Sequence, residues 1–307
     1  MSSSDPPEHP GAGARVGYLG PEGTFTEEAL LSSALPDAVT AVPLASIYDT
    51  VSALREGRVD WAVVPVENSL DGSVTVTLDL LAEDAGDLRI VGEALLAVRH
   101  SLIAAEHVEL AEISTVLTHP QVPGQCRRFL RGELARASVL PAASTAEAVR
   151  TVVAEGRRDQ AALGTLLASE IYGGVVLREG VQDRDDNETR FLWLAREGEE
   201  QSSPPMLRDG EGAWKSSLVF WGSGAGRAGW LVSCLDELAC REINLTKIES
   251  RPRRERLGSY MFFADLSGDV REERVRDAVA GMGRLCEEVR VLGSYRAAAA
   301  RGPAGGA

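Results

Sequence analysis

Short apolar runs alternate with amphipathic segments between residues 15 and 196, and this alternation limits the possible folds more than any other feature of the chain. The run from Trp61 to Val66 is apolar at every position, which is typical of a strand buried on both faces. Strands are expected at 15–19, 41–43, 61–66, 89–98, 115–118, 138–140, 160–163 and 190–194, and helices at 25–33, 46–56, 75–81, 124–130, 145–153 and 166–172. The pattern predicts an α/β architecture rich in parallel strands.

A charged segment without apolar periodicity, residues 197–214, follows this part and is predicted to be a linker. Beyond it, residues 215–297 give the order strand, helix, strand, strand, helix, strand, which is the ferredoxin-like order. The ends, 1–14 and 298–307, are rich in small residues and proline and are expected to be disordered. The chain therefore divides into a larger α/β part and a smaller C-terminal unit.

The composition excludes several classes of protein. Among the 307 residues, 44% are hydrophobic, so a normal core can form, and the net charge of −14 argues against nucleic acid or an anionic membrane as the main partner. No apolar run approaches the roughly 18 residues of a membrane span, and the N-terminus lacks a signal-peptide pattern, so a cytoplasmic location is expected. Cys126, Cys234, Cys240 and Cys286 lack paired metal-ligand spacing and are expected to be reduced thiols, which leaves no metal site predicted.

Three polar motifs follow or open predicted strands, where α/β proteins place their ligands. They are the segments 20–25 (Gly-Pro-Glu-Gly-Thr-Phe), 65–69 (Pro-Val-Glu-Asn-Ser) and 186–191 (Asp-Asn-Glu-Thr-Arg-Phe). The last one places a hydroxyl, a fixed cation and an aromatic ring on consecutive residues. These groups are suited to hold a small anion and to give a proton to a leaving group.

In this order the three motifs resemble the prephenate dehydratase family. The resemblance extends from about residue 16 to 295 and implies a two-lobed, periplasmic-binding-protein-like catalytic domain at 15–196. One lobe would comprise about 15–95 with 175–196, and the other 96–174. It also implies decarboxylating dehydration of prephenate to phenylpyruvate in phenylalanine biosynthesis, with no cofactor. Because few residues precede the first strand, a monofunctional enzyme is expected.

The resemblance assigns roles to the Thr-Arg-Phe motif. Thr189 would be the proton donor; the alternative is that it only opens a strand and caps a turn. Arg190 would clamp a substrate carboxylate, and its alternative is a salt bridge within its own segment, to Asp185, Asp186 or Glu188. Phe191 would pack behind Thr189 and fix its rotamer.

Further residues are assigned to the same site. Asn68 and Ser69 would donate hydrogen bonds to the substrate, whereas Glu67 would hold loop backbone or orient the leaving hydroxyl. The remaining substrate-binding candidates are Gly23, Thr24, Ser144, Thr145, His119 and Gln121. The histidine belongs to a His-Pro-Gln motif like that of the family, but it is not assigned the catalytic proton.

The C-terminal unit resembles the regulatory ACT domain of the same family. In that family the segment corresponding to Asn244–Pro252 and a Gly-Ala-Leu motif form a phenylalanine site between two chains. Here the second motif reads Gly229-Trp230-Leu231, and the indole is expected to narrow or fill the pocket. The residues predicted to bind phenylalanine are Gly229, Trp230, Leu231, Asn244, Leu245, Glu249, Ser250, Arg251 and Pro252. A homodimer or homotetramer is expected, and the alternative is a dimerisation module without a ligand.

Three other functions stay open at this point. Arogenate dehydratase performs the same chemistry on the amino analogue of prephenate. A prephenate decarboxylase that does not aromatise its substrate is expected to lack the acid, so Thr189 argues against it. A non-catalytic amino-acid sensor would not need a proton donor beside the predicted clamp.

Overall fold

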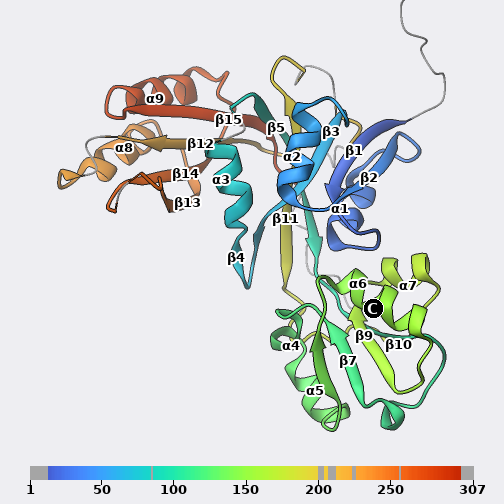
Figure 1. Ribbon diagram of the computed structural model, residues 1–307. Coiled ribbons are helices and arrows are strands. Elements are labelled where there is room, and N and C mark those ends of the chain that lie inside the picture. The colour runs from blue at the N-terminus through green and yellow to red at the C-terminus, as the bar shows by residue number, and fades with distance from the viewer. Residues whose placement is uncertain are drawn as a thin grey trace, which may run out of the picture.

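The computed structural model describes residues 13–83, 86–199, 204–206, 212–222, 226–255 and 257–298. Most of the predicted disordered ends and much of the predicted linker 197–214 lie outside these residues. The described part contains three sheets, and Figure 1 shows them as two lobes, one above the other, with the C-terminal unit beside the upper lobe. Of the predicted linker, residues 204–206 lie against the upper lobe, where Leu35 N–H donates to the Pro205 carbonyl at 2.9 Å.

The sheet of lobe one has the strand order β2-β1-β3-β11-β5, with β4 added at the end of β3. Strands β1, β2 and β3 are parallel, and β11 runs antiparallel to both β3 and β5. Its strands are β1 (Ala14–Leu19), β2 (Val39–Leu44), β3 (Trp61–Asn68), β4 (Gly72–Ser73), β5 (Leu88–Ala97) and β11 (Glu188–Arg196), and its helices are α1 (Phe25–Ser33), α2 (Ile47–Arg55) and α3 (Thr75–Glu83). The segment 188–196, distant in sequence, thus fills the middle of the sheet.

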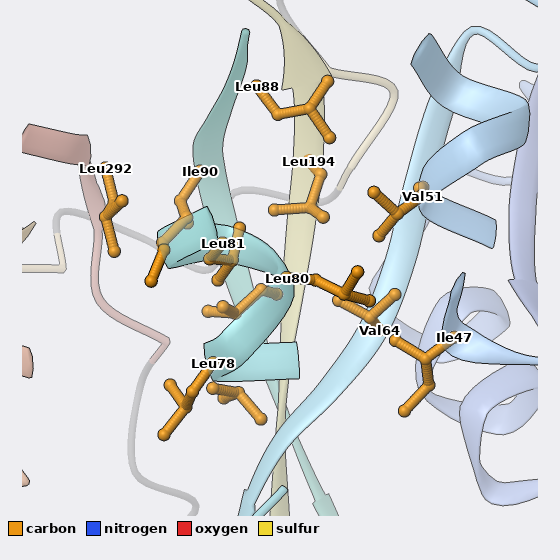
Figure 2. Close-up of a cluster of buried hydrophobic side chains, with 14 of the residues drawn as sticks. Ile47, Val51, Val64, Leu78, Leu80, Leu81, Leu88, Ile90, Leu194 and Leu292 are labelled. Carbon is orange, nitrogen blue, oxygen red and sulfur yellow. The ribbon is translucent and has the colours of Figure 1, made fainter. Parts of the chain in front are cut away.

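Both faces of this sheet are buried, as the apolar run at 61–66 predicted. Val63 belongs to a core on the α1 side, whereas Val64 belongs to a second core with α2 and α3. Figure 2 shows the second core, in which Leu78 and Leu81 of α3 lie near Leu194 of β11 and Leu292 of the C-terminal unit. One hydrophobic core therefore extends across lobe one and the C-terminal unit.

Lobe two has the order β10-β6-β9-β7-β8. Its strands are β6 (Ser101–Ala104), β7 (Thr115–Thr118), β8 (Ser138–Pro141), β9 (Gln160–Gly164) and β10 (Val175–Arg178), and its helices are η1 (Leu110–Glu112), α4 (Val122–Gln125), α5 (Arg127–Glu133), α6 (Thr145–Glu155) and α7 (Leu166–Tyr172). Strands β6 and β10 were not predicted. Because β10 pairs with β6, residues from 175 to 178 belong to lobe two and not, as predicted, to lobe one. The helix predicted at 124–130 is divided at Cys126.

Two crossing segments, residues 98–100 and 179–187, connect the lobes and pair with each other. Val98 N–H donates to the Asn187 carbonyl at 2.8 Å, and Val181 N–H donates to the His100 carbonyl at 2.9 Å. These bonds place the end of β5 and the start of β11 side by side at the boundary between the lobes (Figure 1).

The C-terminal unit has the antiparallel order β13-β14-β12-β15, which confirms the predicted ferredoxin-like arrangement. Its elements are β12 (Trp214–Trp221), α8 (Trp230–Ala239), β13 (Leu245–Pro252), β14 (Tyr260–Ser267), α9 (Glu273–Gly283) and β15 (Glu288–Arg296). Helices α8 and α9 cover one face of its sheet. The other face packs on lobe one through Val219, Phe263 and Leu292. Among the described residues, no helix has the length and apolar character needed to cross a membrane.

Candidate functional site

The end of β3 and the start of β11 bring the predicted proton donor next to Asn68. The strand register places Thr189 opposite Asn68, and Asn68 Nδ2 donates to Thr189 Oγ1 at 2.9 Å. Asn68 Oδ1 accepts from the backbone N–H groups of Leu70 and Asp71, both at 2.9 Å, which fixes the orientation of the amide. The Thr189 hydroxyl therefore acts as an acceptor toward Asn68. Within the described residues no acceptor takes its proton, so that proton can be donated elsewhere.

A chain of hydrogen-bonded side-chain amides continues from this pair into lobe two. Asn68 Nδ2 also donates to Asn187 Oδ1 at 2.8 Å, and Asn187 Nδ2 donates to Gln125 Oε1 at 3.2 Å. Gln125, at the end of α4, uses its own Nε2 to donate to Asp71 Oδ2 of lobe one at 3.0 Å. Asn187 is only 1% exposed. These hydrogen-bonded amides therefore connect the Thr189 hydroxyl to both lobes and to one of the crossing segments.

His100 ends this chain on the other crossing segment. Its Nε2 lies 2.8 Å from Gln125 Oε1, and because an amide oxygen can only accept, Nε2 carries the proton. The Nδ1 atom is buried without a hydrogen-bond partner among the described residues, and the Phe25 ring packs edge-on at 5.5 Å. Burial lowers the pKa of His100, against the opposing effect of the Gln125 hydrogen bond, so the imidazole is neutral near neutral pH.

The loop 20–24 of lobe one touches lobe two directly. Thr165 Oγ1 donates to the Gly23 carbonyl at 2.6 Å, and the Tyr172 hydroxyl donates to the Glu22 carbonyl at 2.8 Å. Gly23 has φ of +82°, and a Cβ there would lie 2.8 Å from Ala168 Cα, so this close approach requires glycine. The two lobes are thus in contact on this side of the crossing segments.

Two predicted substrate ligands are already used as helix caps. Thr24 Oγ1 donates to the Leu19 carbonyl at 2.9 Å and accepts from Glu27 N–H at the start of α1. Ser144 Oγ accepts from Glu147 N–H at 3.0 Å at the start of α6. Thr145 is 7% exposed and lies in the first turn of that helix. These hydroxyls therefore hold the turns that precede α1 and α6.

A cavity of about 440 Å³ opens beside the amide chain, a volume within the range of small-molecule sites. Asn187, Gln125 and Gln121 line it, but Thr189 does not. The other lining residues are Leu70, Asp71, Gly124, Arg127, Arg128, Gln182, Asp183 and Arg184. His119 is not among them and accepts a weak bond from Gln121 N–H at 3.4 Å. Arg184 is paired with Asp186 at 2.6 Å, whereas Arg127 and Arg128 form no salt bridge with the described residues, which favours an anionic occupant.

Sequence reasoning missed four residues of this region: His100, Asn187, Arg127 and Arg128. Asn187 stands inside the 186–191 motif, so its position was a usable signal. His100 lies two residues after a predicted strand, and the arginine pair follows Cys126, but neither pattern is specific by itself. Nothing in the sequence indicated that Gln125 contacts both crossing segments, through His100 and Asn187.

Arg190 is not directed toward this site. It lies 2.6 Å from Asp265 of β14, 3.5 Å from Glu93 and 3.6 Å from Glu67. Neither the predicted substrate clamp nor the salt bridge to its own segment describes these contacts. Burial acts to lower the pKa of Arg190, but the surrounding anionic groups, Asp265 and Glu93 among them, raise it above its ordinary value. The guanidinium therefore remains a cation between lobe one and the C-terminal unit.

The other residues of the two motifs have structural contacts. Glu67 pairs with Lys247 of β13 at 3.0 Å and holds no loop backbone within the described part of the chain. Ser69 Oγ accepts from Glu188 N–H at 3.0 Å and donates to the Asp186 carbonyl at 3.2 Å, so it joins the two strand ends. Phe191 is 1% exposed and belongs to the core on the α1 side. Of the six predicted catalytic residues, only Thr189 and Asn68 share one hydrogen-bonded cluster with the lobe boundary.

The predicted phenylalanine motif occupies several different environments. Trp230 is 4% exposed in the core between α8, α9 and the sheet, and its Nε1 donates to the Leu285 carbonyl at 2.8 Å. Glu249 contacts Ser73, and Arg251 pairs with Asp79 at 2.9 Å, so both face lobe one. Half-buried Leu231 and Leu245 border the same core as Trp230. The members exposed at the surface are Gly229, Asn244, Ser250 and Pro252.

Comparison with known proteins gives one consistent result. The profile of the prephenate dehydratase family matches residues 16–199. A prephenate dehydratase of Mycobacterium sp. (strain JLS) is 40% identical over 298 residues, which cover 94% of this chain and 90% of that protein. The prephenate dehydratase of Arthrobacter aurescens, solved in complex with L-Phe, is 36% identical with a TM-score of 0.80 and covers 92% of this chain and 90% of that one.

Another solved structure shares the fold but carries a different description. It is described as a novel type of quorum-quenching acylase, is 27% identical with a TM-score of 0.80, and covers 92% of this chain and 98% of that one. Because a fold can host unrelated activities, the local chemistry of the site has to carry the functional argument.

Proposed function

The chain belongs to the prephenate dehydratase family, and from this premise we propose that it converts prephenate to phenylpyruvate with Thr189 as the proton donor. The observation that carries the proposal is the fixed amide of Asn68. It donates to the Thr189 hydroxyl and leaves the hydroxyl proton available. A threonine hydroxyl is a weak acid, so it can serve only when it is positioned against the leaving oxygen.

The reaction asks little else of the protein. The bond between the ring and its carboxylate breaks, the electron pair enters the ring, and the ring hydroxyl leaves as water after it takes a proton. One prephenate dianion and one proton give phenylpyruvate, carbon dioxide and water. Aromatisation supplies the driving force, so positioning of the dianion and protonation of one oxygen are sufficient. Within the described residues, no cluster of three or more metal-ligating side chains is present.

The lobe boundary supplies neutral donors and local positive charge for the dianion. The amides of Asn187 and Gln125 and the cavity arginines lie on the two lobes and their crossing segments, and the neutral His100 orients Gln125 through its Nε2–H. We assign the carboxylates of the substrate to this region. The bonds from Thr165 and Tyr172 to loop 20–24 would then hold the lobes closed around the bound molecule.

The test compares Thr189→Ala with Thr189→Ser, which keeps the hydroxyl. We expect Thr189→Ala to lower kcat by about 10²- to 10⁴-fold with little change in KM, and Thr189→Ser to retain most of the activity. The assay follows phenylpyruvate from prephenate, with arogenate run in parallel. Equal activity in Thr189→Ala and the unchanged protein would remove Thr189 from this role. A chain silent on both substrates would favour a sensor, and decarboxylation without phenylpyruvate would favour a decarboxylase.

We further propose that the C-terminal unit is an ACT domain that binds phenylalanine between two chains of a homodimer or homotetramer. Its support is the Asn244–Pro252 motif on β13, an edge strand whose outer positions are exposed. A structural relative at 36% identity is described as a complex with L-Phe. With Trp230 in the core, the indole does not fill a surface pocket.

The phenylalanine proposal predicts saturable binding by calorimetry, inhibition of turnover, and a change in sedimentation when phenylalanine is added. Ser250→Trp would place a bulky side chain at an exposed motif position and is expected to abolish binding, while prephenate turnover continues. Absence of binding to the unchanged protein at millimolar phenylalanine would leave the unit with a structural role only.

A further inference from the structure

The ends of β3 and β11 present different chemistry on their two sides. We call residues 67–69 and 187–190 the β3–β11 tip. The register pairs Thr189 with Asn68 and Arg190 with Glu67. Because side chains alternate along a strand, the hydrogen-bonded pair Asn68–Thr189 and the ion pair Arg190–Glu67 point in opposite directions. The first pair faces the lobe boundary, and the second faces the C-terminal unit.

Arg190 joins a buried cluster of charges that spans the two units. Its Nη1 lies 2.6 Å from Asp265 Oδ2, and Asp265 Oδ1 accepts from Ser217 Oγ at 2.6 Å. The side chains of Arg190 and Asp265 are 13% and 7% exposed. Around them, Lys215 pairs with Glu93 at 2.7 Å, and this glutamate also lies 3.5 Å from Arg190. The cluster is therefore well shielded from solvent.

The charges on the two sides of the interface are complementary. Lobe one contributes one cation, Arg190, and two acids, Glu67 and Glu93. The C-terminal sheet contributes Lys215 and Lys247 together with the acid Asp265, and Glu249 lies at the edge of the group near Lys247. Buried charges are stable only when they are paired, so a displacement of the C-terminal sheet must either move Arg190 or leave charges without partners.

We propose that Asp265 is a positioning residue for the dehydration: by holding Arg190 it fixes the β3–β11 tip and thereby the hydroxyl of Thr189. The C-terminal unit thus acts on Thr189 through the peptide bond that joins Thr189 to Arg190, and it contributes no side chain to the site itself. The second contact to the same tip is the pair between Lys247 and Glu67, at 3.0 Å. The inference rests on the proposed role of Thr189.

The same interface provides a matched control. Arg251 of β13 binds Asp79 of α3 in bidentate geometry, with Nη2 3.0 and 2.9 Å from the two carboxylate oxygens. The side chains of Arg251 and Asp79 are 19% and 9% exposed, so this ion pair is nearly as buried as the one at Asp265. It joins the C-terminal unit to a helix and does not touch the β3–β11 tip. Loss of this pair therefore weakens docking between the units without acting on Thr189.

The experiment compares Asp265→Asn with Asp79→Asn in the full chain. Each substitution keeps the shape of the side chain and removes its charge. Since a misplacement of about 1 Å can cost about 10²-fold in rate, we expect Asp265→Asn to lower kcat for prephenate by about 10- to 100-fold. Its KM should stay within about twofold, and Asp79→Asn should leave both constants within about twofold. Equal losses in the two variants, or a loss through KM alone, would overturn the proposal.

A second readout does not depend on turnover. Hydrogen–deuterium exchange of peptides covering 66–70 and 186–191 should become faster in Asp265→Asn and stay unchanged in Asp79→Asn. If Asp265→Asn does not fold, Lys247→Met removes the other contact to the tip and should change the same peptides and kcat in the same direction. Unchanged exchange in these peptides would refute the positioning role. If the unchanged protein makes no phenylpyruvate, the proposed function fails, and exchange alone decides whether the tip is held by Asp265.

Discussion

The substitution Asn68→Asp tests the orientation of the Thr189 hydroxyl most directly. Asparagine donates from Nδ2 to Thr189 Oγ1 at 2.9 Å and to Asn187 Oδ1 at 2.8 Å. Aspartate has the same shape and can still accept from the backbone N–H groups of Leu70 and Asp71, but it replaces the donor by a second acceptor. Thr189 would then give its proton to the carboxylate, and the Asn187 oxygen would face another oxygen.

The magnitude follows from these two contacts. The hydrogen bond to Thr189 is reversed and the one to Asn187, worth about 0.5–1.5 kcal/mol, is lost, so the free energy of unfolding should fall by about 0.5–1.5 kcal/mol at neutral pH. Turnover should fall by about 10²- to 10⁴-fold, because the proton of Thr189 is no longer available to the leaving hydroxyl. KM should change little, since the substitution leaves the cavity residues in place.

The protonation of the introduced carboxylate decides how the stability of the Asn68→Asp variant depends on pH. The introduced carboxylate accepts from the N–H groups of Leu70 and Asp71 and from the Thr189 hydroxyl, and these three bonds outweigh the one facing oxygen of Asn187, so its pKa in the folded variant should lie below the unfolded value of about 3.9. The stabilisation from these bonds is present above that unfolded value and is lost as the pH falls through the folded pKa. The deficit in stability relative to the unchanged protein should therefore be constant near neutral pH and grow below about pH 4.

The assay measures kcat for phenylpyruvate formation at several pH values, together with urea unfolding. Ser69→Ala is the control, because Ser69 lies in the same turn and joins the strand ends without touching Thr189. It should lose stability and lower kcat less than Asn68→Asp does, because the Asn68 donor to Thr189 stays in place. Near-normal kcat in Asn68→Asp at neutral pH would refute the argument that the Asn68 donor sets the direction of the Thr189 proton.

Three further outcomes are expected. Trp230→Ala should lower the free energy of unfolding by about 3–5 kcal/mol, because its indole is 4% exposed in a packed core, and an unchanged urea midpoint would contradict this. Burial lowers the pKa of His100 in the folded protein below its unfolded value of about 6.5. Below that pH the unfolded state therefore binds more protons, and the free energy of unfolding falls as the pH is reduced. His100→Gln should make that fall between about pH 7 and 5 less steep, as followed by urea unfolding at each pH. Gly23→Ala should cost more than about 1 kcal/mol in thermal unfolding, because φ is +82° and the new Cβ would lie 2.8 Å from Ala168 Cα; an equal melting temperature would show that the loop relaxes freely.

Local periodicity predicted much of the architecture. The run at 61–66 became a central strand buried on both faces, and the helix predicted at 25–33 is α1. Short strands were missed, because β6 follows the apolar end of β5 without a strong break and β10, at the sheet edge, is partly exposed. Edge strands carry little periodic signal, since fewer of their side chains are buried.

The site was predictable only in part. Residue types at strand ends indicated Thr189 and Asn68, which do meet. Arg190 was assigned to the same site because it is adjacent in sequence, yet its side chain points to the opposite face of the strand. The opposite direction of the Arg190 side chain follows from the alternation along a strand. Its partner, Asp265, lies far along the chain, and no local pattern connects the two residues.

The sequence by itself determined most of the order of elements, the two kinds of sheet and the family, because these depend on local periodicity and on short motifs. The tertiary structure decided which side chains share a face and which unit they meet. It placed Trp230 in a core, turned Glu249 and Arg251 toward lobe one, and joined Arg190 to the C-terminal sheet. These contacts arise from the packing of distant segments, and buried charge selects its partner by position in space and not by position in the chain.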